Sequence, residues 1–236
     1  MQPAIPPLVD LPKLLAASDR VSNDTDSEDD LRLLLAPGSS LGGARPKAAV
    51  VDSNGSLAIA KFPHKGDEYN IELWSCLALV LARNAGIKVP SHRMTNVADR
   101  QVLLVMRFDR NSGRRIPFLS AMSMIGAADD ETHSYLELVD AIRQHGAEVR
   151  EDLRELWRRV LFNVLVSNVD DHLRNYGFLY DTLKRGWRLS PACDLNPVPV
   201  DVKPRILSMM IDDRDNWLPS IWLSKLGYTL DWKTMK

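Results

Sequence analysis

Hydrophobic positions in the first half of the chain follow strand-like patterns. Ala48–Asp52 and Leu57–Phe62 have the composition of short strands, and they flank Asn54-Gly55. This dipeptide suits a type I′ turn, because both of its residues tolerate a positive φ. Val102–Phe108 is a nearly continuous apolar run, which is typical of a buried strand. The pattern therefore predicts a β-hairpin and a third strand.

Helical periodicity governs three longer segments. Apolar residues recur at spacings of three, four and seven over Ile71–Ala85, and Gly86 ends that helix. Ser134–His145 has a helical pattern as well. The clearest helix is Leu153–Leu165, whose apolar side chains keep to one face over about four turns. The last two segments predict a mainly helical second half.

A polar loop follows the last of these helices, and two short strands, Tyr176–Tyr180 and Trp187–Ser190, come after it. This order of elements predicts two lobes with a cleft between them. We therefore expect an α+β fold of the two-lobed, protein-kinase-like type. A small β-rich lobe would cover residues 38–110, and a mainly helical lobe would cover residues 111–236.

The two ends of the chain have weaker patterns. Residues 1–37 are rich in Pro and contain the acidic run Asp24–Asp30, so we expect them to be partly disordered. Within them only Leu31–Ala36 suggests a short helix. Near the other end, the spacing of apolar residues in Trp217–Leu226 is compatible with one helix.

The composition is that of a globular protein. The chain has 236 residues, of which 45% are hydrophobic and 26% charged, and its net charge of −1 argues against a dominating basic face for nucleic acid or an anionic membrane. No apolar run approaches the ~20 residues needed to cross a bilayer. Cys76 and Cys193 lie far apart, which argues against a disulfide scaffold and a cysteine zinc site. We expect a reduced, soluble, cytoplasmic protein that binds neither membranes nor nucleic acid directly.

The densest cluster of polar side chains is Asn168–Asn175. It reads either as an exposed loop or as a functional site, because unpaired polar groups are costly beside an apolar helix. Asp170 and Asn175 are five residues apart, the interval of the protein-kinase catalytic loop D-x-x-x-x-N. In that loop the Asp orients and deprotonates the acceptor hydroxyl, and the Asn binds magnesium, which prefers oxygen ligands.

Phosphoryl transfer also needs a second carboxylate and a cation on the nucleotide phosphates. Asp194, 24 residues after Asp170, follows a predicted strand and fits the first role, although alone it would read as a turn residue. Lys61 lies on the second hairpin strand and fits the other role, although a strand lysine is often a residue of the sheet edge. Glu72 on the following helix is a candidate ion-pair partner for Lys61.

A glycine pair precedes the hairpin. Gly42-Gly43, within Ser39–Lys47, would let backbone amides approach an anion closely. The segment is not a Walker A motif, and a plain flexible loop is the alternative reading.

Taken together, these segments resemble the HipA family, the serine/threonine kinases of bacterial toxin–antitoxin modules. The matching pieces occur in family order and cover roughly residues 38–200. They are S-x-G-G-A-R-P-K at 40–47, A-K-F-P at 60–63, A-R-N-A-G-I-K-V-P at 82–90, M-R-F-D-R at 106–110, N-V-D-D-H-L-R-N-Y-G-F at 168–178 and S-P-A-C-D at 190–194.

The resemblance implies ATP and Mg²⁺ as cofactors. It implies that Asp170 is the catalytic base, that Asn175 and Asp194 bind magnesium, and that Ser40 is autophosphorylated. It further implies a phosphate-binding loop, an ATP-binding lysine and an adenine-binding hinge strand. The residues implied to bind the nucleotide are Gly42, Gly43, Ala44, Arg45, Pro46, Lys47, Lys61, Met106, Arg107, Phe108, His172, Leu173, Arg174, Asn175, Cys193 and Asp194.

The resemblance also implies a protein substrate and a DNA-binding antitoxin as partner. Family members are typically longer at both ends, so we expect a shortened member of the family. One alternative is therefore a catalytically inactive module that keeps the fold.

Another alternative is a metal-dependent phosphohydrolase that uses Asp170, Asp171 and His172. Such enzymes need further histidine ligands. The remaining histidines, which show no supporting spacing, are His64, His92, His133 and His145.

Overall fold

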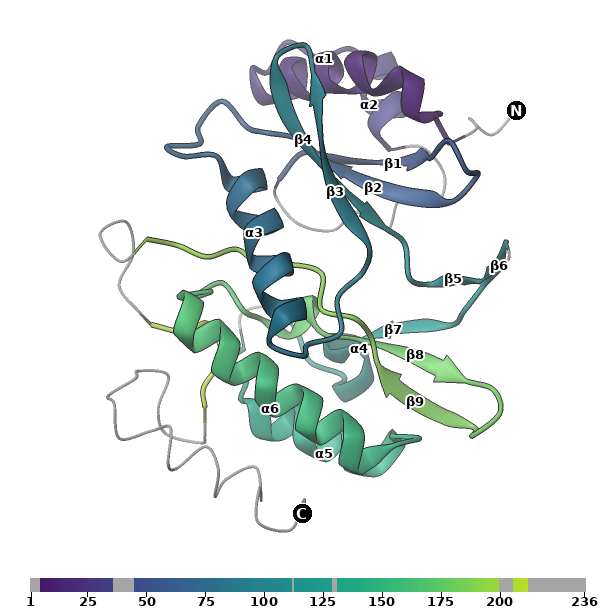
Figure 1. Cartoon of the computed structure of the whole chain (residues 1–236), viewed down its shortest axis with the longest axis vertical. Coiled ribbons are helices and arrows are strands. Elements are labelled where there is room, and N and C mark those ends of the chain that lie inside the picture. The colour runs from purple at the N-terminus through teal and green to yellow at the C-terminus, as the bar shows by residue number, and fades with distance from the viewer. Residues whose placement is uncertain (1–4, 36–44, 112, 129–130, 200–205, 212–236) are drawn as a thin grey trace. The chain divides into compact units, whose positions relative to one another are not determined.

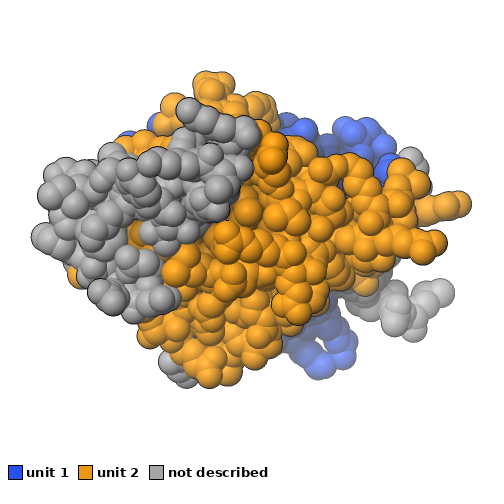
Figure 2. Space-filling model, turned by 90° about the horizontal axis from the view of Figure 1, so that it is seen from below, with its two compact units in different colours: residues 1–77, 90–113 blue, residues 78–89, 114–236 orange. Residues whose placement is uncertain are grey.

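The computed structural model describes residues 5–35, 45–111, 113–128, 131–199 and 206–211. The chain divides into two compact units, which are coloured separately in Figure 2. Unit 1 comprises residues 1–77 and 90–113, and unit 2 comprises residues 78–89 and 114–236. The later boundary between the units, at 113–114, lies close to the lobe boundary that we expected at 110–111. However, residues 78–89, which we expected in the first lobe, belong to unit 2.

A four-stranded antiparallel sheet forms the centre of unit 1. Its strands are β1 (Lys47–Val51), β2 (Leu57–Lys61), β3 (His92–Val97) and β4 (Arg100–Met106), in the order β1-β2-β4-β3 (Figure 1). The predicted hairpin and the predicted buried strand are confirmed. Strand β3 was not predicted, because most of its side chains are at least partly exposed and show no alternation.

The turn between β1 and β2 differs from the prediction. The loop has five residues, Asp52–Ser56, and within it only Gly55 has a positive φ, of 80°. The backbone N–H of Gly55 donates to the carbonyl oxygen of Asp52 at 2.9 Å, and Asn54 accepts a hydrogen bond from Ser56 N–H through its side chain at 2.9 Å. The type I′ prediction is therefore wrong, because a five-residue loop needs only one left-handed residue here.

The expectation of disorder for residues 1–37 is wrong where the structure describes them. Helices α1 (Leu11–Ser22) and α2 (Glu28–Leu34) pack on the sheet of unit 1 (Figure 1), and a short 3₁₀ helix, η1 (Leu8–Asp10), precedes them. The Pro and Asp content suggested disorder, but the apolar residues recur at helical spacing and reach the core. Those that are buried are Leu11, Leu14, Leu15, Ala17 and Leu34.

The end of the acidic run forms the first turn of helix α2. Ser27 and Asp30 form a capping box, in which each side chain accepts a hydrogen bond from the other residue's backbone N–H. Asp30 also accepts a hydrogen bond from Nε of Arg20 on α1 at 2.9 Å, and this contact lowers the pKa of Asp30 below its usual range. The helix predicted at Leu31–Ala36 therefore begins earlier, at Glu28.

Helix α3 (Ile71–Asn84) confirms another prediction. It is followed by Gly86, whose φ of 78° suits the left-handed conformation that ends a helix. The boundary between the units falls within this helix. Two strands of two residues each, β5 (Arg110–Asn111) and β6 (Arg114–Arg115), flank the later boundary.

Unit 2 combines helices with a three-stranded antiparallel sheet of order β7-β8-β9 (Figure 1). The two long helices and the β8–β9 hairpin were predicted; β7 was not, because it has only three residues. The elements are β7 (Phe118–Ser120), α4 (Ala121–Ile125), α5 (Tyr135–His145), α6 (Val149–Val166), η2 (Leu173–Asn175), β8 (Gly177–Asp181) and β9 (Gly186–Leu189).

A second hydrophobic core lies inside unit 2. Side chains from α5, α6 and the β8–β9 hairpin meet there, as the helical periodicity predicts. Its most deeply buried members include Tyr135, Leu138, Ile142, Leu156, Val160 and Phe178.

Within the described ranges, no helix is both long and apolar enough to cross a bilayer. Both cysteines carry free thiols. The helix suggested for residues 217–226 lies outside the described residues.

Replacing Leu14 by Ala tests whether α1 belongs to the folded unit. We expect the free energy of unfolding to fall by about 2–5 kcal/mol, because the Leu14 side chain is 0% exposed. Val9→Ala is the control, since Val9 is 80% exposed and its loss should change stability by no more than about 0.5 kcal/mol. Urea denaturation of the full chain measures both. An unchanged midpoint for Leu14→Ala would contradict the packing of α1.

Candidate active site

The polar cluster predicted to carry the chemistry is a loop at the C-terminal end of α6. Ser167 ends the helix in the left-handed conformation, with φ of 57°. Asn168 is fully buried; its side-chain amide donates to Oδ1 of Asn163 at 3.1 Å, and its own Oδ1 accepts from the backbone N–H of Asn196 at 3.2 Å. Asn168 therefore ties the helix end to the segment that contains Asp194.

Asp171 anchors the middle of this loop in the core of unit 2. Its Oδ2 accepts three hydrogen bonds of 2.7 Å, from the hydroxyls of Tyr135 and Tyr176 and from the side-chain amide of Asn163. Burial raises the pKa of Asp171, although these three donors oppose the shift. The donors come from α5, α6 and the residue after η2, so one carboxylate fixes the loop to three parts of the unit.

Asp170, the predicted catalytic base, is exposed although its neighbour Asp171 is buried. The backbone carbonyl of Asp170 accepts a hydrogen bond from Nδ2 of Asn175 at 2.9 Å. With Nδ2 engaged in this way, Oδ1 of Asn175 is the atom available to a cation. An amide oxygen is a ligand atom that magnesium accepts, so Oδ1 fits the magnesium role predicted for Asn175.

The structure brings the segment of Asp194 alongside this loop. Oδ1 of Asp194 accepts a hydrogen bond from Nδ2 of Asn196 at 3.0 Å, and the backbone N–H of Val198 donates to the carbonyl oxygen of Ser167 at 3.1 Å. Among the residues that the structure describes, no three His, Cys, Asp or Glu side chains are grouped to hold a metal. One carboxylate and one amide oxygen are the share that magnesium commonly takes from a protein when phosphates supply the rest.

The residues predicted to line the nucleotide site after Asp170 divide in two. Nδ1 of His172 is buried and has no hydrogen-bond partner among the described residues, and a buried polar atom of this kind needs one. The side chain of Leu173, in contrast, packs in the core of unit 2 because the η2 turn directs it inward. The contact predicted between Leu173 and the nucleotide would therefore have to come from its backbone. Arg174 is exposed.

Buried ion pairs fix strand β9, which leads to Asp194. Asp152 on α6 accepts hydrogen bonds from Nε of Arg188 at 3.0 Å and from the backbone N–H of Leu189 at 3.2 Å. Arg159, 2% exposed, donates to Glu155 and, at 2.6 Å, to the carbonyl oxygen at position 190. Removing one partner of such a pair leaves a buried charge unpaired, which is costly. These contacts therefore hold strand β9 in place.

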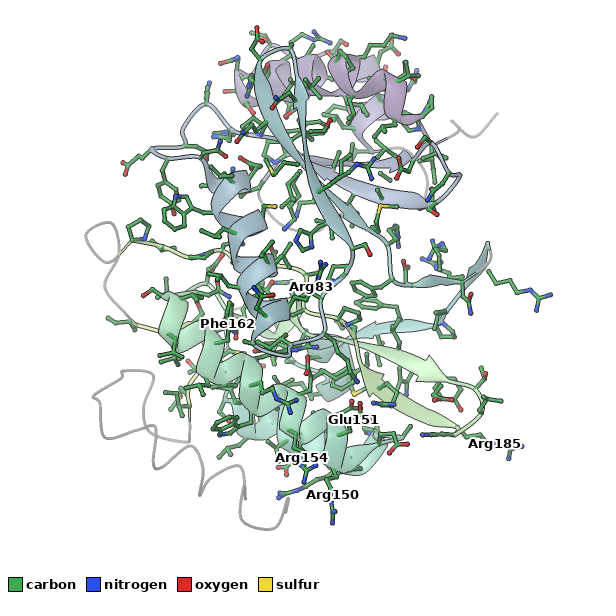
Figure 3. The ribbon with its side chains drawn as sticks, viewed as in Figure 1. Arg83, Arg150, Glu151, Arg154, Phe162 and Arg185 are labelled. Carbon is green, nitrogen blue, oxygen red and sulfur yellow. The ribbon has the colours of Figure 1, made fainter. Side chains whose placement is uncertain are left out.

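The outer residues of α6 contribute less. Arg150, Glu151 and Arg154 project from the N-terminal half of the helix (Figure 3). Glu151 pairs with Lys88 at 2.5 Å and with Arg188 at 3.1 Å, and the contact with Lys88 lowers its pKa. Glu151 is exposed, and exposed pairs contribute at most about 1 kcal/mol. Its buried neighbour Asp152 is the residue that positions β9.

In unit 1 the structure places Lys61 opposite Lys47. The two residues are direct partners in the register of β2 and β1. The arrangement therefore concentrates positive charge where the sequence predicts contacts with nucleotide phosphates.

The carboxylate of Glu72 pairs with Arg45 instead of the predicted partner Lys61. Nη2 of Arg45 donates to Oε1 of Glu72 at 2.9 Å, and Arg45 also makes a bidentate contact with Asp67, with both distances 2.7 Å. The hypothesis of a Lys61–Glu72 ion pair is corrected accordingly. The reason is that the guanidinium of Arg45 offers several donors in a fork that spans both carboxylates.

The predicted hinge, Met106–Phe108, begins at the last residue of β4. The backbone N–H of Met106 donates to the carbonyl oxygen of Ser91 at 2.8 Å, and the backbone N–H of Arg107 donates to the carbonyl oxygen of Leu57 at 2.9 Å.

The carboxylate of Asp109, just after the hinge, pairs with Arg107. Burial raises the pKa of Asp109, but the Arg107 guanidinium, 2.6 Å away, outweighs burial and leaves the pKa below its ordinary value.

Three other residues predicted to bind the nucleotide have ordinary backbone contacts or are partly buried. The carbonyl oxygen of Pro46 accepts from the backbone N–H of Phe62, and Phe108 and Cys193 are half-buried. Four predicted residues lie outside the described ones, namely Ser40, Gly42, Gly43 and Ala44.

The structure thus brings Asp170, Asn175 and the Asp194 segment together within unit 2, and it brings Lys47 and Lys61 together within unit 1. The sequence reasoning missed the anchors of Asp171. One signal was available: Asn163 is a polar residue on the apolar face of α6. Tyr135 and Tyr176 read as ordinary core aromatics, so nothing pointed to their hydroxyls.

The chain is similar to several known proteins. Residues 39–236 match the family described as HipA-like C-terminal domain. A curated Haemophilus influenzae protein named "Putative kinase" is 24% identical over 153 residues, which are 57% of this chain. The chain spans 44% of that relative's length.

Two solved structures share the fold. HipA of Shewanella oneidensis MR-1, solved with HipB and its operator DNA, matches 98% of this chain and 60% of its own, with a TM-score of 0.71 and 20% identity. The Helicobacter pylori proinflammatory kinase CtkA matches 70% of this chain and 59% of its own, with a TM-score of 0.56 and 21% identity. The predicted kinase-like fold is therefore confirmed.

Asp171→Asn tests the state of the buried anchor through pH. Because the folded pKa lies above the ordinary value of 3.8, the folded protein binds this proton more tightly than the unfolded chain does. The contribution of Asp171 to stability is therefore greatest below pH 3.8 and is lost as the pH rises through the folded pKa. Relative to the variant, which does not titrate here, the wild-type protein should lose free energy of unfolding over that rise.

Denaturant titrations of both proteins at a series of pH values measure this difference. Asp140→Asn, at an exposed position of α5, is the control for simple loss of a carboxylate. A wild-type protein that gains stability over Asp171→Asn as the pH rises would contradict the raised pKa.

Proposed function

The chain belongs to the HipA-like C-terminal domain family, and we propose that it is a serine/threonine protein kinase that uses ATP and Mg²⁺. It would transfer the γ-phosphate to a protein hydroxyl. The observation that carries the proposal is the loop in which exposed Asp170 precedes buried Asp171 and is hydrogen-bonded to Asn175. Such a loop presents the carboxylate of Asp170 to a substrate, while the buried carboxylate of Asp171 holds the loop in place.

Asp170 would orient the substrate hydroxyl and accept its proton. Phosphoryl transfer needs little covalent chemistry from the protein, so positioning and charge stabilisation supply most of the rate. The three donors to Asp171 support the positioning, because they leave the loop a single conformation in the core. The exposure of Asp170 gives a hydroxyl access to its carboxylate.

Magnesium, when bound, would neutralise charge on the phosphates, and Asn175 and Asp194 are the residues that would hold it. Lys61 and Lys47, opposed on β2 and β1, would add positive charge to the phosphate site. His172 would form a hydrogen bond to the nucleotide through Nδ1, which is buried and otherwise lacks a partner among the described residues.

We further propose Ser40 as an autophosphorylation site and a DNA-binding antitoxin as the partner. Support for the partner comes from the related Shewanella oneidensis HipA, whose structure contains HipB and operator DNA. The net charge of −1 gives this chain no general attraction to DNA, so the antitoxin would make the DNA contact. The reaction would take place in the cytoplasm, on a protein substrate.

The surroundings of Asp171 argue against the phosphohydrolase alternative. That reading needs Asp171 as a metal ligand beside Asp170 and His172. However, Asp171 is only 2% exposed, and its Oδ2 already accepts three hydrogen bonds from protein groups. The carboxylate has a structural role that a metal ligand at this position would have to give up.

Asp170→Ala should lower the rate of phosphotransfer by about 10²–10⁴-fold, because it removes the general base. Nucleotide binding should remain, since the phosphate and metal contacts come from other residues. Transfer of label from radiolabelled ATP and equilibrium binding of ATP measure the two effects. Asp140→Ala, at an exposed position of α5, is the matched control and should transfer phosphate at the wild-type rate.

Incubation of the wild-type protein with radiolabelled ATP, followed by mass spectrometry, tests the remaining parts of the proposal. We expect phosphate on Ser40 and complete loss of transfer when EDTA removes magnesium. Phosphate on other serines would support the proposed kinase activity but contradict the role of Ser40. ATP binding without any transfer would instead identify an inactive binding module.

A further inference from the structure

A cavity of about 820 Å³ lies within unit 1. None of the residues assigned to the nucleotide or magnesium lines it, although Arg45 contacts two of its lining residues, Asp67 and Glu72. Its walls come from the loop before α3, the first turn of α3 and the end of the β3–β4 hairpin. The volume is in the range of small-molecule sites, which is about 300–1,000 Å³. The lining residues are Pro63, His64, Asp67, Tyr69, Asn70, Glu72, Leu73, Asn96, Asp99, Arg100 and Gln101.

Glu72 gives this cavity an unsatisfied acceptor. The residue is 2% exposed, and its Oε1 accepts the hydrogen bond from Arg45. Its Oε2 is buried and has no hydrogen-bond partner among the described residues. Leaving a buried carboxylate oxygen without a hydrogen-bond donor is costly. We therefore expect this oxygen to accept a hydrogen bond from a bound ligand.

The charge of the lining favours a cation. Glu72, Asp67 and Asp99 are the carboxylates of the lining, and Arg100 is its arginine. Arg45, which does not line the cavity, pairs with Asp67 and with Oε1 of Glu72, and leaves Asp99 and Oε2 of Glu72 to the cavity. Arg100 is already held by both carboxylate oxygens of Asp19, at 2.5 and 2.6 Å, and by a backbone carbonyl. An anionic ligand would meet net repulsion here, and a cationic ligand would meet attraction.

We propose that this cavity binds a guanidinium group. A guanidinium is a weakly hydrated planar cation with several donors, so it can bind Glu72 Oε2 and still reach other acceptors of the lining. Hydrogen bonds between a guanidinium and a carboxylate are among the strong ones in proteins. Asp99 lies at the β3–β4 turn, where φ is 60°, and supplies a second carboxylate. This site does not depend on the kinase activity.

Calorimetric titration of the full chain tests the proposal. Agmatine represents a small guanidinium compound, and Nα-acetyl-arginine amide represents an arginine side chain in a polypeptide. We expect wild-type protein to bind at least one of them and Glu72→Gln to bind it at least about tenfold more weakly, because the charge that faces the cavity is gone. Putrescine, which carries ammonium groups only, should bind more weakly than agmatine.

Asp52→Asn is the matched control. Asp52 is also a buried carboxylate of unit 1 in contact with an arginine, Arg93, but it does not line the cavity. Its affinity for the probe should equal that of the wild-type protein. Circular dichroism verifies that each variant is folded.

Asp99→Asn is the second variant, which keeps the test decisive if Glu72→Gln does not fold. Asp99 is exposed, and Asn tolerates its left-handed backbone, so this variant should fold and bind at least about threefold more weakly. Binding of agmatine alone would assign the site to small compounds, and binding of both probes would admit arginine side chains as well. Absence of binding at millimolar concentration, or wild-type affinity in both variants, would overturn the proposal.

Discussion

The carboxylate of Asp171 is the interaction on which the candidate active site depends. One oxygen atom accepts hydrogen bonds from α5, from α6 and from the residue after η2. A buried carboxylate without these donors would be unstable, and the donors without the carboxylate would be unsatisfied in turn. Because the four groups need one another, the loop has one position, and Asp170 beside it is held in a defined place while remaining exposed.

Buried carboxylates recur wherever the chain has to hold a segment that carries chemistry. Asp152 fixes strand β9, and Asp67 and Glu72 together hold Arg45. Apolar packing gives each unit its stability, but packing alone is not directional. Hydrogen-bonded charges supply the direction. Glu72 differs from the others because only one of its oxygens is satisfied by the described residues, and this difference marks the cavity beside it as a binding site.

The family relationship and the physical reading of the loop support each other. The family match covers residues 39–236, and the HipA structure shares the fold over nearly the whole chain. The loop geometry adds what a fold match does not give, since fold alone does not determine function. Three features support our proposal of a phosphoryl-transfer site over a plain surface loop. They are the exposed carboxylate of Asp170, the oriented amide of Asn175, and Nδ1 of His172, which has no hydrogen-bond partner among the described residues.

The sequence by itself determined the elements whose pattern is local. The β1–β2 hairpin, α3, α5, α6 and the β8–β9 hairpin follow from periodicity. The interval between Asp170 and Asn175 is the sequence feature on which the proposed phosphoryl transfer is based. Composition misled for residues 5–35, where two helices cover the sheet. Only the tertiary structure decided that Asp171 faces the core, that Glu72 pairs with Arg45, and that β3 joins the sheet. These contacts join residues far apart in the chain, and no local pattern encodes which distant donor will meet a given carboxylate once both are buried.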